Sequence, residues 1–84
     1  MTIEIKISEK TDEEFNSEYL EILAETSHPQ KQIMFYINGH HLATTMTDDQ
    51  GNISAGTSFE KDTEYFFEVE CEGEHKSKKY HAPK

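Results

Sequence analysis

The chain has 84 residues, of which 33% are hydrophobic and 30% are charged, and its formal net charge at pH 7 is −9. Binding to phosphate groups requires clustered cations, so 17 acidic residues against 8 lysines and no arginine exclude nucleic acid and disfavour anionic lipid surfaces. The length predicts one domain, residues 1–84, with a small hydrophobic core.

The first predicted element is a half-buried strand over residues 2–8, where three isoleucines alternate with charged or polar side chains. The alternation stops at Glu9, and we predict that the polar run 9–14 is a connection. Two interpretations compete over residues 11–25. Thr11 and Glu14 resemble a helix capping box, and the apolar side chains that follow also fit helical spacing. The chain alternates with strand period from residue 19, so we predict a strand over 19–26, with a helix near 11–25 as the alternative.

A hairpin at the centre of the chain organises the predicted fold. Asn38 and Gly39 both tolerate the positive φ that a type I′ turn requires, and segments rich in β-branched and aromatic residues flank them. The first arm, Ile33 to Ile37, is apolar on both faces, which is typical of a strand inside a sheet. The second arm runs as far as Thr47.

We predict that the rest of the chain forms strands separated by turns. In order, we predict a turn over 48–52 with positive φ at Gly51, a strand over 53–59, a turn over 60–62, a strand over 64–72, a turn at 73–74 and a strand over 75–81. The strand 64–72 directs Tyr65, Phe67, Val69 and Cys71 inward and leaves Phe66 as the one exposed aromatic residue.

Lysines in the last strand predict a sheet edge, and they are expected to pair across the strands with the glutamates of residues 64–72. The chain's single cysteine, Cys71, excludes an internal disulfide, and its apolar strand face predicts a buried, inert thiol. Seven short strands with frequent turn signals predict an all-β fold, a two-sheet antiparallel β-sandwich.

Several segments resemble the bacterial immunoglobulin-like domains. In chain order they are Tyr19 to Thr26, Ile33 to Gly39, Leu42 to Thr45, Asp48 to Asn52 and Thr63 to Glu70. Residues 59–65 are also similar to the fibronectin type III pattern L-x-P-G-T-x-Y, although Lys61 and Asp62 replace its proline and glycine. The resemblance implies an immunoglobulin-like sandwich in which Tyr65 hydrogen-bonds to upstream backbone.

The resemblance also implies a non-enzymatic structural or protein-interaction module, as found in surface proteins or phage virion proteins, with no cofactor. No apolar run approaches the roughly 18 residues of a membrane span and no signal-peptide pattern is present, so an extracellular role would require a longer chain or another export route. We expect a protein partner. The candidate interaction residues are Tyr36, Phe66, Tyr80, Glu68 and Glu70.

An alternative function follows from the acidic composition. The acidic residues of 9–18, together with Glu68, Glu70, Glu72 and Glu74, are candidates for imitating a phosphate backbone. The protein would then be a small inhibitor that binds a basic nucleic-acid-binding protein.

The sequence offers little that points to metal binding or catalysis. The five histidines lack the spacing of a structural zinc site, and adjacent His40 and His41 point to opposite faces of a strand. Asp48 and Asp49 are weak calcium candidates, because they lie beside a glycine but lack the alternating ligands of a calcium loop. No nucleophile elbow or phosphate-binding loop is present, so we expect no enzymatic activity.

Overall fold

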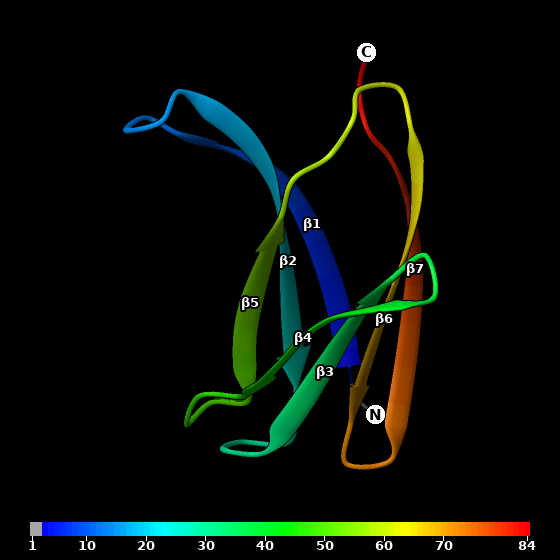
Figure 1. Cartoon of the computed structure of the whole chain (residues 1–84). Helices are drawn as coiled ribbons and strands as arrows, with labels where there is room; N and C mark the ends of the chain where they lie inside the picture. Colours follow the sequence, from blue (N-terminus) through cyan, green and yellow to red (C-terminus); the bar gives the residue numbers. More distant parts are fainter. Residues whose placement is uncertain (1–2) are drawn as a thin grey trace.

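Seven strands run through residues 3–84, which are the residues that the computed structural model describes. They are β1 (Ile3–Asp12), β2 (Ser17–Thr26), β3 (Gln32–Ile37), β4 (His40–Met46), β5 (Asn52–Thr57), β6 (Glu64–Cys71) and β7 (Glu74–His81). One sheet has the order β1-β2-β5 and the other has the order β4-β3-β6-β7, with every neighbouring pair antiparallel (Figure 1). The predicted two-sheet antiparallel β-sandwich of seven strands is confirmed.

The helical alternative at residues 11–25 is wrong, because these residues lie in β1, a turn and β2. Among residues 3–84 there is no helix that is long and apolar enough to cross a membrane. Thr2, the first residue of the first predicted strand, lies outside the described residues.

The core lies between the two sheets and is built by strand alternation. All four inward side chains predicted for β6 are buried, and Phe66 on its other side is 37% exposed. They meet Leu20, Ile22 and Ala24 of β2 from the opposite sheet. The predicted burial of Cys71 is confirmed, and burial, together with the nearby carboxylates, raises the pKa of its thiol.

The predicted connection at residues 9–14 is wrong, because β1 continues to Asp12 and pairs with β2 as far as Ser17. β5 pairs with β2 only between Leu20 and Glu25, so residues 10–18 form a two-stranded ribbon beyond the sandwich (Figure 1). We call this ribbon the finger. No second layer covers the finger, so its strands need no apolar alternation and give no strand pattern in the sequence.

The central hairpin matches its prediction. β3 lies between β4 and β6, and Asn38 and Gly39 have φ values of 51° and 82°. Gly51 also has the predicted positive φ, 86°. The last hairpin turns one residue earlier than predicted, because positive φ occurs at Glu72 and Gly73, and β7 therefore begins at Glu74.

β7 is an edge strand, as predicted, but its lysines do not oppose glutamates. Lys76 stands opposite Val69 and Lys78 opposite Phe67, so both start on the core side of the sheet. The Lys78 ammonium reaches across and donates to the Ile5 carbonyl oxygen of β1 at 3.2 Å. The predicted lysine–glutamate pairing is therefore wrong, and this edge contacts the edge of the other sheet.

Tyr65 forms the expected corner near the start of β6. Its hydroxyl oxygen accepts a hydrogen bond of 2.7 Å from the backbone N–H of Glu60, in the connection that precedes the strand. This bond fixes the connection between β5 in one sheet and β6 in the other.

Candidate binding face

The solvent side of the four-stranded sheet brings most of the predicted interaction residues together. Strand alternation directs Met34 and Tyr36 of β3 away from the core, and in β6 Glu70 lies opposite Met34 and Glu68 opposite Tyr36. Phe66 follows on the same side of β6. We call this surface the outer face. Four of the five predicted residues, Tyr36, Phe66, Glu68 and Glu70, belong to it.

Local contacts hold the Tyr36 ring in place on the outer face. Its ring centroid lies 5.9 Å from that of His41 on β4, at an interplanar angle of 76°. Its hydroxyl contacts the Met34 sulfur at 3.5 Å, and His41 Nε2 lies 2.6 Å from the Thr44 hydroxyl. An aromatic side chain that is already ordered loses less conformational entropy when a partner packs against it.

On the outer side of β6, Phe66 lies next to the carboxylates of Glu68 and Glu70. Glu68 Oε2 lies 2.9 Å from His75 Nε2 on β7, a contact that becomes an ion pair when the histidine is protonated. Phe66 is anchored through its backbone N–H, which donates to Asn38 Oδ1 at 2.9 Å, while its ring stays exposed. The outer face thus offers aromatic surface beside carboxylates, which suits a partner with apolar and cationic side chains.

Tyr80 does not belong to the outer face. It stands opposite Tyr65 on the core side of the sheet, packs against the core and is only partly exposed. Its hydroxyl donates to Glu9 Oε2 at 3.1 Å. Burial, followed by this bond to Glu9, raises the pKa of the Tyr80 hydroxyl. This tyrosine therefore ties β7 to β1 at the base of the finger.

The weak calcium candidates lie in the β4–β5 turn, where Asp48 Oδ1 is already a hydrogen-bond acceptor. Asp48 Oδ1 accepts hydrogen bonds from the N–H groups of Asn52 and Gln50, at 2.8 and 2.9 Å. These bonds, that from Asn52 first, lower the pKa of the Asp48 carboxyl. Within residues 3–84 no group of three or more His, Cys, Asp or Glu side chains is placed to hold a metal ion. Asp48 therefore acts as the cap of the β4–β5 turn.

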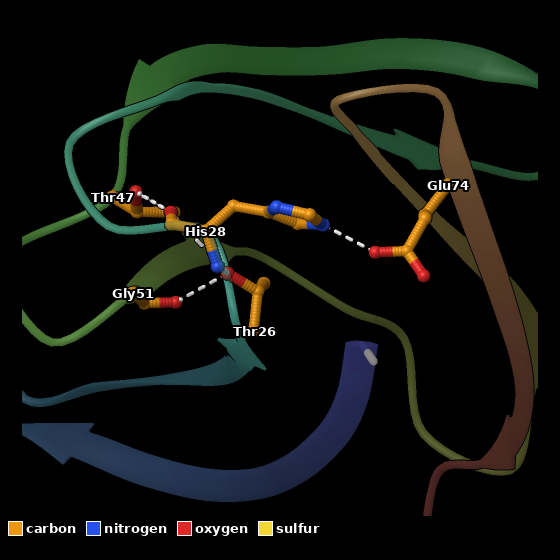
Figure 2. A network of polar contacts seen from close by, with 5 residues as sticks. All are labelled: Thr26, His28, Thr47, Gly51 and Glu74. Atoms are coloured by element: carbon orange, nitrogen blue, oxygen red, sulfur yellow. Dashed lines mark hydrogen bonds and ion pairs between the residues drawn. The ribbon is translucent and has the colours of Figure 1, made fainter. Parts of the chain in front are cut away.

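A polar network joins the loops at the other end of the sandwich from the finger (Figures 1 and 2). The Thr26 hydroxyl donates to the Gly51 carbonyl at 2.8 Å, and the buried Thr47 hydroxyl donates to the His28 carbonyl at 2.6 Å. The His28 ring contacts the Glu74 carboxylate at the start of β7 (Figure 2). The network links the β2–β3, β4–β5 and β6–β7 connections. We interpret it as structural because its polar groups serve as hydrogen-bond partners for one another.

Two exposed apolar residues were not among the predicted site residues. Phe15, in the turn of the finger, is 72% exposed, and Met46 at the end of β4 is 57% exposed. A lone aromatic residue directly after the polar run 9–14 and ahead of the strand predicted over 19–26 was the available signal for Phe15. The helical alternative over 11–25 counted this ring only among the apolar side chains at helical spacing.

The acidic residues that are candidates for imitating a phosphate backbone form two groups on different elements. One group lies on the finger, and the other runs along β6 into the β6–β7 turn, towards the opposite end of the molecule (Figure 1).

Comparison of the chain with protein-family models, with curated proteins and with solved structures gives no significant match.

Proposed function

We propose that the protein is a non-enzymatic interaction module of the immunoglobulin-like type, and that the outer face of β4, β3, β6 and β7 binds a protein partner. The observation that carries the proposal is the grouping of Tyr36, Phe66 and Glu68 on one solvent-exposed sheet surface. Aromatic side chains supply much of the energy at protein interfaces, and flanking carboxylates add selectivity for a basic partner.

Two features of the fold support the immunoglobulin-like assignment. The division into sheets of three and four strands, with the first and last strands at neighbouring edges, agrees with the sandwich that the sequence resemblance implies. The Tyr65 corner is a second feature expected of such domains. Domains of this kind commonly act as structural units of surface or virion proteins, which is the setting we propose.

The test compares capture of protein partners by three immobilised forms of the domain. The outer-face variant carries Tyr36→Ala and Phe66→Ala, and the matched control carries Phe15→Ala, which removes an exposed aromatic ring from the finger instead. We expect the outer-face variant to lose the partner that the unchanged domain and the control both retain. Circular dichroism and urea melts must first show that all three forms are folded. Equal capture by all three forms would contradict the outer face as the binding surface.

Salt dependence separates this function from that of an acidic inhibitor. Binding through the outer face buries aromatic surface and should persist between about 50 and 200 mM salt, whereas ionic contacts weaken over this range. An inhibitor that imitates a phosphate backbone would capture a basic nucleic-acid-binding protein, lose it steeply with salt, and be insensitive to the loss of Tyr36 and Phe66.

A further inference from the structure

Charged residues are distributed very unevenly along this chain. The protein has 25 acidic and basic residues, the sum of 17 and 8, yet residues 32–59 contain only Asp48 and Asp49. The uncharged residues of this segment include all of β3, β4 and β5. In a chain with 30% charged residues, an uncharged stretch of this length leaves three strands without the charges that keep protein surfaces apart.

The fold places the uncharged strands on one side of the sandwich. β1 and β7 are the edges of the two sheets on one side, where Lys78 and Tyr80 bridge them. β4 and β5 are the edges on the opposite side (Figure 1). Exposed strand edges pair readily with other strands, and charged side chains are a usual protection against this. β1 and β7 carry such charges, whereas β4 and β5 carry no Asp, Glu or Lys.

Of the two uncharged edges, β4 is better suited to pairing. It carries Met46, 57% exposed, and exposed Thr44, a β-branched residue with high strand propensity. β5 contains Gly56, which weakens a strand as a pairing template. Among the described residues, β4 pairs only with β3 and leaves its other edge open.

We propose that β4 is a self-association edge, where two copies of this chain pair antiparallel about a two-fold axis near Thr44. The two four-stranded sheets become one continuous sheet of eight strands, with exposed Thr44 of the two copies meeting at the axis and exposed Met46 of each copy lying along the new contact. A second copy is the occupant because β4 sets no Asp, Glu or Lys against the same strand of another copy, while the carboxylates of the finger and of β6 lie on other elements. The proposal goes beyond the outer-face function and needs no other protein.

Sedimentation velocity of the purified chain tests the pairing directly. An edge contact is smaller than the roughly 1,600 Å² of a standard interface, so we expect a weak dimer that forms between about 10 µM and 1 mM. Thr44→Lys places two ammonium groups against each other at the axis and should lower the association constant by at least about tenfold. Ser77→Lys, a matched change on the exposed β7 edge, should leave it unchanged.

Met46→Lys serves as a second variant if Thr44→Lys fails to fold, and it should weaken the dimer in the same direction. Hydrogen exchange of the backbone amides in residues 43–45 should slow as the fraction of dimer rises, because the open edge gains hydrogen bonds. A chain that stays monomeric over this whole concentration range would overturn the proposal. The open edge of β4 would then be a candidate for pairing with a strand of another protein. A dimer that Ser77→Lys weakens as much as Thr44→Lys would also overturn it.

Discussion

The substitution Gly51→Ala tests whether the loop network depends on the absence of a side chain at residue 51. Gly51 has a φ of 86°, and a Cβ there would lie well inside contact distance of the Thr26 carbonyl oxygen and 3.2 Å from its Oγ1. Thr26 cannot move aside freely, because its N–H and its hydroxyl both donate to the Gly51 carbonyl, at 2.9 and 2.8 Å. The added methyl group must therefore stretch or break the link between β2 and the β4–β5 turn.

The magnitude follows from comparison with Gly39→Ala. Gly39 has a similar φ of 82°, but no atom lies within 4 Å of an added Cβ. Both alanines carry the strain of left-handed backbone, about 1–2 kcal/mol. Only the alanine at position 51 also disturbs two hydrogen bonds, each with a net contribution of about 0.5–1.5 kcal/mol. We therefore expect Gly51→Ala to lower the free energy of unfolding by about 1–3 kcal/mol more than Gly39→Ala.

Urea denaturation of the three proteins, followed by circular dichroism, measures this difference if the m-values agree. Equal losses at the two positions would refute the reasoning, because they would show that backbone strain alone sets the cost and that the Thr26 link contributes nothing.

Three further outcomes check the core, the turn and the thiol. Phe67→Ala should destabilise the fold by about 3–5 kcal/mol and Phe66→Ala by less than about 1 kcal/mol in urea melts, and reversed values would mean a shifted β6 register. The pKa of Asp48 is lowered, so its carboxylate stabilises the fold above the ordinary value of 3.8 and this contribution is lost in acid. The stability gap between the unchanged protein and Asp48→Asn should thus be largest near neutral pH and narrow below that value, and a constant gap would exclude the charge as its cause. Cys71 should react with a thiol reagent far more slowly in buffer than in denaturing urea, because burial raises its pKa; equal rates would show an accessible thiol.

Local patterns predicted the centre of the fold well because the inward side of each central strand faces the other sheet. The alternation in residues 64–72 gave the correct buried set, and Asn38-Gly39 gave the correct hairpin because few residue pairs accept positive φ at both positions. The same alternation placed Tyr36 and Phe66 outward. Their meeting on one face depends on which strands are neighbours, and local patterns do not contain the strand order.

The errors occur where a strand has no second layer or where register decides the contact. The finger lacks a buried side, so residues 9–14 resemble a connection although they include the end of β1. The sequence predicts Tyr80 as an interaction residue, but its pairing with Tyr65 directs it to the core side. The sequence predicts that the lysines of β7 pair with the glutamates of β6, but the register sets Lys76 opposite Val69 instead. In a hairpin the turn type and loop length set the register, and a change of one residue in this register reverses the face of every side chain.

The finger should be the least stable part of the sheet, and this can be measured residue by residue. Two-stranded ribbons are marginally stable in water, and residues 10–18 have neither a third strand nor core contacts, while residues 20–25 have both. Opening of the finger should therefore cost far less free energy than global unfolding. In native-state hydrogen exchange, the amides of residues 20–25 should report the free energy of global unfolding, and those of the finger a much smaller value. Tyr80→Phe removes the hydroxyl that donates to Glu9 and should speed exchange at the base of the finger, whereas Phe15→Ser at its exposed tip should not. Uniform protection along β1 and β2 would mean that the finger is held by contacts other than those of its own ladder.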